Sequence, residues 1–197
     1  MLHFEILAET IFFDTVSAFD NSVYKLVSSW MAEGLTSYMK IISFIGSGWI
    51  LTIISVAAVI VELRYRKALK WSLMIALNLA AVSLLNNILK VIIHRPRPDI
   101  LQLVEVGGYS FPSWHAMTAI SFFGYLIYLI LIHFKSWTRY VSAGLLGLLI
   151  FTIGISRIYL GVHYASDVLA GYIFGLIWLS VYIWLSSRFS LRTKIKI

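Results

Sequence analysis

Five apolar stretches without a charged residue account for about half of the chain. They are Ile41–Val61, Trp71–Leu89, Ala116–Ile132, Tyr140–Ser156 and Val168–Ser187. A helix needs roughly 20 apolar residues to cross a hydrocarbon layer of about 30 Å, and a membrane span must satisfy all its backbone polar groups internally. The pattern therefore predicts an all-α membrane protein, a polytopic bundle of five spanning helices.

The first 40 residues follow a different pattern, because acidic residues interrupt the apolar positions at intervals too short for a span. They are Glu5, Glu9, Asp14 and Asp20. Apolar residues over Val23–Ser43 recur with helical spacing, which favours a helix lying at the membrane interface. A weak sixth span near Ile6–Val16 is the alternative. We expect a single domain, with an interfacial segment over 1–40, the bundle over 41–187 and a basic tail over 188–197.

The composition supports a membrane protein, because 60% of the residues are hydrophobic, only 13% are charged, and the mean hydropathy is +0.86. A soluble domain has about 45–50% apolar and about 25% charged residues. The chain has no cysteine, which excludes disulfides, thiolate nucleophiles and Cys-ligated metal centres. A net charge of +7 would suggest nucleic acid as a partner of a soluble protein. Here the cations stand at the ends of apolar runs, so we expect the bilayer and no nucleic acid as partner.

Ten of the 16 basic residues orient the bundle, because they fall on segments that lie on one side of the membrane by alternation of the spans. They are Arg64, Arg66, Lys67, Lys70, Lys135, Arg139, Arg188, Arg192, Lys194 and Lys196. Positive residues accumulate on the cytoplasmic side of membrane proteins. The loops over 90–115 and 157–167 are therefore predicted to lie on the extracytoplasmic face of the plasma membrane.

These two outer loops carry one Lys, three Arg and three His. A single cation at a span end would be interpreted as a headgroup anchor, whereas this combination indicates a binding site for an anion such as phosphate. Ser110 and Pro112 resemble a helix start, with Ser as the N-cap and the following N–H groups directed at the anion. His163 and Asp167 are four residues apart, so the carboxylate can orient the imidazole as a nucleophile. A local hydrogen bond that caps a helix is the other interpretation of this pair.

Three motifs in this order resemble the signature of the type 2 phosphatidic acid phosphatase superfamily, which is K-x6-R-P, P-S-G-H and S-R-x5-H-x3-D. The chain matches it with Lys90 and Arg97-Pro98, with Pro112-Ser113-Trp114-His115, and with Ser156-Arg157, His163 and Asp167. The one departure is Trp114, which stands where the family has Gly, and its indole is expected at the pocket rim or against neighbouring helices. Arg95 duplicates the Arg-Pro pair, and we expect it to contact headgroups.

The resemblance implies a metal-independent hydrolase of a lipid phosphate or pyrophosphate. In that mechanism His163 is the nucleophile that becomes a phosphohistidine, Asp167 fixes its tautomer, and His115 protonates the leaving oxygen and then activates water. The phosphoryl oxygens are held by Lys90, Arg97, Ser113, the Trp114 amide and Arg157. No cofactor and no metal are implied, and the outer loops supply only Asp99 and Glu105 as further carboxylates.

The predicted partners are a membrane lipid phosphate and the bilayer, and no oligomer is required. The sequence does not distinguish phosphatidylglycerophosphate, phosphatidic acid and an isoprenyl pyrophosphate as substrates. One alternative function is a lipid-phosphate binding or transport protein that lost catalysis through Trp114. A haloperoxidase-like enzyme is a further alternative, disfavoured by the five spans.

Two further patterns concern packing within the bundle. Asn78, Asn86 and Asn87 lie inside the second apolar stretch and are expected to form hydrogen bonds between helices. Gly171 and Gly175 are four residues apart and predict a close approach of two helices.

Overall fold

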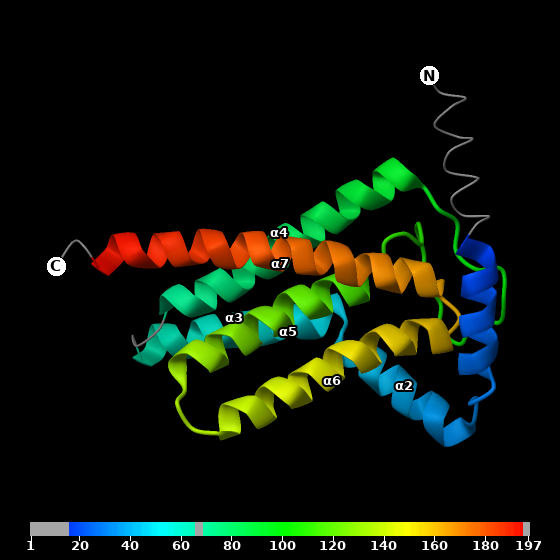
Figure 1. The fold of residues 1–197 in the computed structure, drawn as a ribbon, viewed down its shortest axis with the longest axis horizontal. Coiled ribbons are helices and arrows are strands. Elements are labelled where there is room, and N and C mark those ends of the chain that lie inside the picture. The colour runs from blue at the N-terminus through cyan, green and yellow to red at the C-terminus, as the bar shows by residue number, and fades with distance from the viewer. Residues whose placement is uncertain (1–15, 66–68, 195–197) are drawn as a thin grey trace.

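The computed structural model describes residues 16–65 and 69–194 (Figure 1). Its helices are the segment 16–28, α2 (Glu33–Ile45), α3 (Gly48–Tyr65), α4 (Leu69–Ile93), α5 (Trp114–His133), α6 (Thr138–Tyr159) and α7 (Ala165–Lys194). Over these two ranges no residue is in a strand, so the predicted all-α fold is confirmed.

Helix α5 forms the centre of the bundle and packs against α4, α6 and α7 (Figure 1). The side of α7 that faces it carries Gly171 and Gly175. A Cβ atom added at Gly175 would lie 2.1 Å from Ile120 and 2.8 Å from the Met117 carbonyl oxygen. Only glycine allows the two backbones to come this close, so the predicted close approach is confirmed.

Buried amides connect α4 to its neighbours. The Asn78 amide donates to the Ser121 carbonyl at 2.9 Å and accepts from the Trp178 indole N–H at 2.8 Å. The Asn86 amide donates to the Pro112 carbonyl at 3.3 Å. The prediction of hydrogen bonds between helices is therefore confirmed for these two residues, whereas the third, Asn87, is exposed on the surface of α4.

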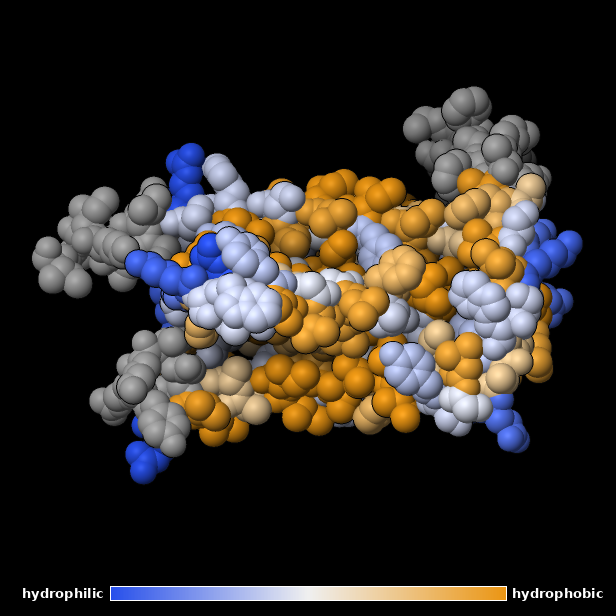
Figure 2. All heavy atoms as spheres, turned by 60° about the horizontal axis from the view of Figure 1, so that its bottom comes forward, coloured by the Kyte–Doolittle hydropathy of each residue, from blue (hydrophilic) through white to orange (hydrophobic). Residues whose placement is uncertain are grey.

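Four of the described helices are long and apolar enough to span a membrane: Leu69–Ile93, Trp114–His133, Thr138–Tyr159 and Ala165–Arg188. Figure 2 shows hydrophobic side chains gathered along the middle of the molecule and hydrophilic ones toward its two ends. Large apolar side chains such as Leu145 and Ile177 are exposed on these helices. A surface of this kind is stable only against lipid.

The predicted span Ile41–Val61 is not a single helix, although α2 and α3 together are long and apolar enough to form one bent span. It runs across the break between α2 and α3, which are bent by 47° relative to each other. The break falls at Gly46, where a Cβ atom would lie 2.7 Å from the Ile153 side chain of α6. The sequence pattern does not reveal the bend, because Gly46, which permits this close contact, does not interrupt the run of apolar residues.

The prediction of one interfacial helix over Val23–Ser43 is wrong, because this stretch is divided between two helices. The helix at 16–28 and α2 are separated by a turn, and Ala32 before α2 is extended. The Tyr159 hydroxyl at the end of α6 fixes this turn, since it accepts from the Ala32 N–H at 3.2 Å and contacts the Thr36 hydroxyl at 2.8 Å. The alternative span near Ile6–Val16 lies, apart from its last residue, outside the described residues.

The helix at 16–28 lies across the end of the bundle where α6 ends and α7 begins (Figure 1). Helix α4 ends and the loop at 94–113 lies at this same end. The connection between α5 and α6 lies at the opposite end, with the C-terminal part of α7. The two groups of segments that the sequence assigned to opposite faces are thus at opposite ends of the molecule.

Candidate active site

The three sequence motifs converge where α4 ends, α5 begins, and α6 turns into α7. His163 and Asp167 lie at the centre of this region, and their side chains are almost completely buried. The Nδ1 atom of His163 lies 3.4 Å from Oδ2 of Asp167. The Nε2 atom of the same ring lies 3.4 Å from Nη1 of Arg97. One side of the imidazole therefore faces a carboxylate and the other faces a cation.

The Asp167 carboxylate is held by four groups. Its Oδ2 atom accepts hydrogen bonds from the Ser110 hydroxyl and from the Tyr164 N–H, the latter at 2.9 Å, besides facing His163. Its Oδ1 atom accepts from Nη1 of Arg95 at 2.6 Å. Because the carboxylate is buried and fixed from several directions, it favours one orientation of the His163 ring.

The protonation state of His163 follows from its burial. Burial, together with the charges of Arg157 and Arg97, lowers the pKa of the imidazole to about 4, although the hydrogen bond and charge of Asp167 act in the opposite direction. The ring is therefore neutral at ordinary pH. In the Nδ1–H tautomer the ring donates a hydrogen bond to Asp167, which leaves the lone pair of Nε2 on the side of Arg97.

Carbonyl groups hold the Arg97 guanidinium beside that lone pair. Its Nε donates to Gly108 at 3.0 Å, its Nη2 to Gly107 at 2.8 Å and its Nη1 to Val162 at 2.7 Å. Burial lowers the pKa of Arg97, and the charge of Asp167 raises it. Burial disfavours the charged form of Arg97, and the protein compensates this charge only in part. An anion bound next to Arg97 would therefore be stabilised by the remaining positive charge.

The other predicted cations lie in the same site. The Lys90 ammonium donates to the Tyr109 carbonyl, and Nη1 of Arg157 donates to the Ser43 hydroxyl at 2.5 Å. The charges of Lys90, Arg97 and Arg157 all act on the imidazole of His115. Such a concentration of positive charge is unfavourable alone and is suited to binding an anion.

Two buried polar atoms of the site have no hydrogen-bond partner among the described residues: Arg157 Nε and Ser113 Oγ. Buried donors are almost always paired in folded proteins. Both belong to the residues predicted to hold phosphoryl oxygens, and both could donate to such an oxygen.

The predicted helix start at Ser110 is wrong. Helix α5 begins at Trp114 with Ser113 as the N-cap residue, and the first intrahelical bond runs from the Met117 N–H to the Ser113 carbonyl. The Ser113 N–H donates to the Asp167 carbonyl at 3.0 Å and is not available to an anion. The N–H groups of Trp114 and His115 remain at the helix start, where an anion is favoured. Ser110 fails as a cap because its hydroxyl bonds to Asp167 instead.

The Trp114 indole is directed at a neighbouring helix. A Cβ atom at Gly48 of α3 would lie 3.2 Å from its ring, and the His115 ring packs edge-on against it with 5.3 Å between centroids. With Trp49 and Thr52, these three residues line a hollow between α3 and α5. The indole therefore lies both against a helix and at the rim of a cavity that His115 reaches, as the sequence predicts.

Arg95 was predicted to contact headgroups, and this prediction is wrong. Its side chain is only 6% exposed and lies between two carboxylates, those of Asp20 and Asp167. Sequence reasoning missed Asp20 and Ser43 as neighbours of the site, and it gave Ser110 a different role. The only sequence signal for Asp20 was that it interrupts the apolar pattern, and this did not indicate which cation it meets.

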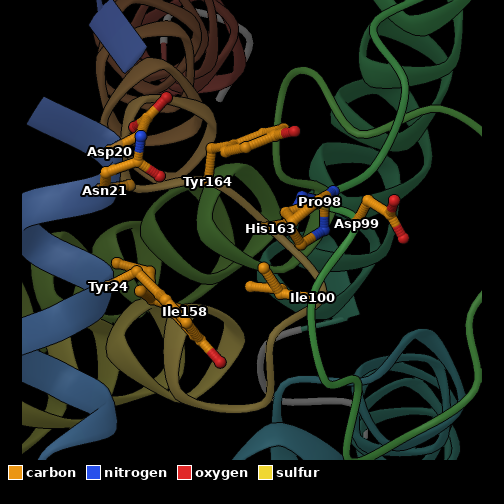
Figure 3. A pocket seen from close by; sticks show the side chains of 10 residues that line it. Asp20, Asn21, Tyr24, Pro98, Asp99, Ile100, Ile158, His163 and Tyr164 are labelled. Carbon is orange, nitrogen blue, oxygen red and sulfur yellow. The ribbon is translucent and has the colours of Figure 1, made fainter. Parts of the chain in front are cut away.

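A cavity of about 230 Å³ opens beside His163 (Figure 3). One wall is the helix at 16–28, with Asp20, Asn21 and Tyr24. The opposite wall includes Pro98 and Asp99 of the loop. The amino-terminal helix thus contributes directly to the surroundings of the site.

The fold and the site define a polytopic helical membrane protein. Its site has a buried His–Asp pair surrounded by cations of the kind that bind phosphate. Within the described part of the chain, no group of three His, Asp or Glu residues is arranged to hold a metal ion. The donor set of the site is cationic, which suits an anion.

Comparisons with known proteins agree with this class. The sequence matches the PAP2 superfamily over residues 71–190. It is 34% identical to phosphatidylglycerophosphatase B of Bacillus subtilis (strain 168) over 182 residues, covering 89% of this chain and 87% of the relative. It is also 34% identical to lipid A 4'-phosphatase of Bacteroides thetaiotaomicron over 123 residues, covering 56% of this chain and 52% of that protein.

Solved structures show the same fold. The crystal structure of a transmembrane PAP2-type phosphatidylglycerolphosphate phosphatase from Bacillus subtilis has a TM-score of 0.83 and 31% identity, covering 95% of this chain and 94% of that one. LpxE of Aquifex aeolicus has a TM-score of 0.66 and 24% identity, covering 82% and 93%, and so shows the fold alone. The chain belongs to the PAP2 superfamily, and the resemblance drawn from its motifs is confirmed.

Proposed function

We propose that this chain removes a phosphate or pyrophosphate group from a membrane lipid at the extracytoplasmic surface, through a phosphohistidine on His163. At the level of class it is a multi-pass membrane lipid phosphatase of the PAP2 superfamily. The observation that carries the proposed chemistry is the placement of the His163 Nε2 lone pair, next to Arg97 and opposite the Asp167 carboxylate.

In the first step, His163 Nε2 attacks phosphorus and forms the P–N bond while the P–O bond to the lipid breaks. His115 gives its proton to the departing lipid oxygen, and Asp167 stabilises the positive ring of the phosphohistidine. In the second step, His115 takes a proton from water. The oxygen of that water attacks phosphorus, the P–N bond breaks, inorganic phosphate leaves, and His163 returns to its neutral form.

The cations carry the other part of the mechanism. Arg97, Lys90 and Arg157 offset the charge on the phosphoryl oxygens, and the Ser113 hydroxyl and the Trp114 N–H donate to them. The unpartnered Arg157 Nε and Ser113 Oγ support this role, because a bound phosphoryl group would supply their missing acceptors. The domain division, with the bundle over 41–187 as the catalytic part, stays a proposal, and Asp20 extends the site beyond it.

A panel of lipids tests the function. Phosphatidylglycerophosphate, phosphatidic acid and undecaprenyl pyrophosphate are presented in detergent micelles with EDTA to the wild type and to His163→Ala, and phosphate release is measured. We expect release from at least one lipid by the wild type alone, with phosphatidylglycerophosphate tested first because of the 34% identical relative. Lipid binding without release would favour the binding or transport alternative, and strict dependence on added metal would contradict the metal-free mechanism.

The retention of both His115 and His163 argues against a pure binding protein, since binding a phosphate requires neither an acid nor a nucleophile. A haloperoxidase-like activity is disfavoured by the four described helices that can span a membrane.

The acid limb of activity is expected near pH 4. Above a pKa of about 4 the His163 ring is neutral and can attack, and below it the proton occupies the lone pair. The kcat/KM profile of the free enzyme should therefore fall as pH decreases through this value. Because Asp167 raises this pKa, Asp167→Asn should move the limb to lower pH. Samples returned to neutral pH before assay control for irreversible unfolding, and a limb above pH 6 would contradict a buried neutral nucleophile.

Trp114→Gly should keep activity and broaden or shift the preference among headgroups. The indole lines the hollow that His115 reaches, whereas the proposed mechanism uses only the Trp114 amide at the phosphate. Glycine at a helix start would also lower stability by up to about 1 kcal/mol before the lost packing on Gly48 is counted. The measurement is kcat/KM for each lipid of the panel, with thermal unfolding alongside. Complete inactivation would show that the indole itself serves catalysis, and an unchanged preference would show that it does not shape the headgroup site.

The side of the membrane can be tested with introduced cysteines, because the chain has none. Glu105 and Lys135 are both exposed and belong to opposite ends of the bundle. We expect a membrane-impermeant thiol reagent to label Glu105→Cys but not Lys135→Cys in intact cells, and both after permeabilisation. The reverse pattern would place the active site on the cytoplasmic side.

A further inference from the structure

Asp20, which belongs to none of the three motifs, is buried next to the catalytic pair. Its side chain is 2% exposed and comes from the helix at 16–28. The Oδ1 atom accepts a hydrogen bond from the Ser166 N–H at 2.7 Å. The Oδ2 atom accepts from the Ser166 hydroxyl at 2.7 Å and from Nη2 of Arg95 at 2.9 Å. One carboxylate thus binds both the first turn of α7 and a cation of the 94–113 loop.

Arg95 connects Asp20 to Asp167. While Nη2 donates to Asp20, Nη1 donates to Oδ1 of Asp167 at 2.6 Å and to the Ser166 hydroxyl at 2.7 Å. Its guanidinium lies over the Tyr164 ring, 4.0 Å from the centroid. In the view of Figure 3, Tyr164 lies between Asp20 and His163. A buried guanidinium is stable only when its edges are paired, so each carboxylate fixes one edge.

Asp20 shares one cation with Asp167, so a change at Asp20 can alter how Arg95 holds the carboxylate of Asp167. Its Oδ2 atom is 3.4 Å from His163 Nδ1, which is longer than an ordinary hydrogen bond, so a small rotation of the carboxylate strengthens or breaks this contact. The Oδ1 bond to Arg95 opposes such a rotation. If Asp20 lost its charge, Arg95 could turn both of its Nη groups toward Asp167 and draw that carboxylate away from the imidazole.

We propose that Asp20 is a positioning residue of the active site: by holding Arg95 and the first turn of α7, it keeps Asp167 facing His163. The inference rests on the proposed function, because it acts through the nucleophile. It makes the amino-terminal helix part of the catalytic apparatus, although this helix lies outside all three motifs and touches no predicted phosphate ligand.

The test is Asp20→Asn, which keeps the shape of the side chain and removes its charge. We expect kcat for phosphate release to fall by about 10- to 100-fold, as for other residues that orient a catalytic group, while KM stays within about threefold. Asp20→Glu restores the charge and should recover part of kcat. Asp99→Asn is the matched control, because it removes an exposed carboxylate from the rim of the same cavity.

A purely structural role predicts a different result. Asp20→Asn would then lower the melting temperature, and the folded fraction would keep the kcat of the wild type, which would overturn the inference. If Asp20→Asn does not fold, Arg95→Lys replaces it, since lysine keeps the charge between the carboxylates but cannot pair with both through a fork. We expect the same loss in kcat with little change in KM, and wild-type kcat would contradict the proposal.

A double-mutant cycle separates action through Asp167 from any other route. In an Asp167→Asn background, Asp20→Asn should cause no further loss, because the group it positions is gone. Losses that multiply would show that Asp20 acts independently, and the inference would be wrong. A wild type that releases phosphate from no lipid would contradict the proposed function and the inference with it, whereas an active wild type with an equally active Asp20→Asn would contradict the inference alone.

Discussion

His163→Ala is expected to reduce lipid-phosphate turnover by about 10³-fold or more and to leave lipid binding nearly unchanged. In the proposed mechanism the imidazole supplies the electron pair that forms the P–N bond. The same proposal assigns the affinity for phosphate to the cations, which the variant retains. The His163 ring is buried, so the substitution by Ala leaves a small cavity next to Asp167. Thermal unfolding should therefore be recorded beside activity.

The measurement combines single-turnover phosphate release with equilibrium binding of the same lipid. His133→Ala is the matched control, because this histidine is exposed at the far end of α5, where its ring contacts the Leu129 carbonyl of its own helix and Trp71 of α4. In the wild type, rapid mixing with lipid followed by quenching in base should trap phosphate on the protein. Turnover above about 10% of wild type in His163→Ala would show that another group attacks phosphorus.

Arg97→Ala is expected to lower kcat/KM by about 10²–10³-fold, with both a lower kcat and a higher KM. Its guanidinium is the cation nearest to the nucleophilic nitrogen, and charge builds on the phosphoryl oxygens at that position. The substitution also leaves three loop carbonyls without their donor, at Gly107, Gly108 and Val162. Arg157→Ala should likewise weaken both binding and turnover.

Arg97→Lys separates charge from geometry. Lysine keeps a cation in the site but cannot reach the three carbonyls and a phosphoryl group together, so we expect it to recover binding better than kcat. Arg139→Ala is the control, because it removes an arginine at the opposite end of the bundle. An Arg97→Ala variant with unchanged KM would contradict a direct contact with the phosphate.

The motifs could be predicted from sequence because their geometry is local. Asp167 lies in the first turn of α7 and His163 two residues before this helix, and their four-residue spacing brings the two side chains together. The identities of the phosphate-binding cations came from the resemblance to the family signature, whose spacing selects Lys90, Arg97 and Arg157. The structure groups them around His115 and His163, and their individual catalytic roles stay predictions.

Contacts between distant segments were not readable in this way. Arg95 was expected at headgroups because its partner, Asp20, is 75 residues earlier in the chain. The same difficulty explains Ser110, whose hydroxyl has a cap-like sequence context but bonds to a carboxylate 57 residues later. Both predictions treated the side chain as part of an isolated loop. In the structure, a buried partner from another segment determines the contact instead.

By itself, the sequence determined the all-α membrane fold, four of its spans, the end of the bundle that carries the site, and the motif residues. The fold, the spans and the end of the bundle follow from run length and charge placement, which are properties of neighbouring residues, and the motif residues follow from the resemblance to the family signature. Only the tertiary structure decided the bend at Gly46, the division of the predicted interfacial helix, and the pairing of Asp20 with Arg95. Each of these depends on which side chain meets which across the bundle, because a close backbone contact or a buried charge is stabilised by a partner that the local pattern does not contain.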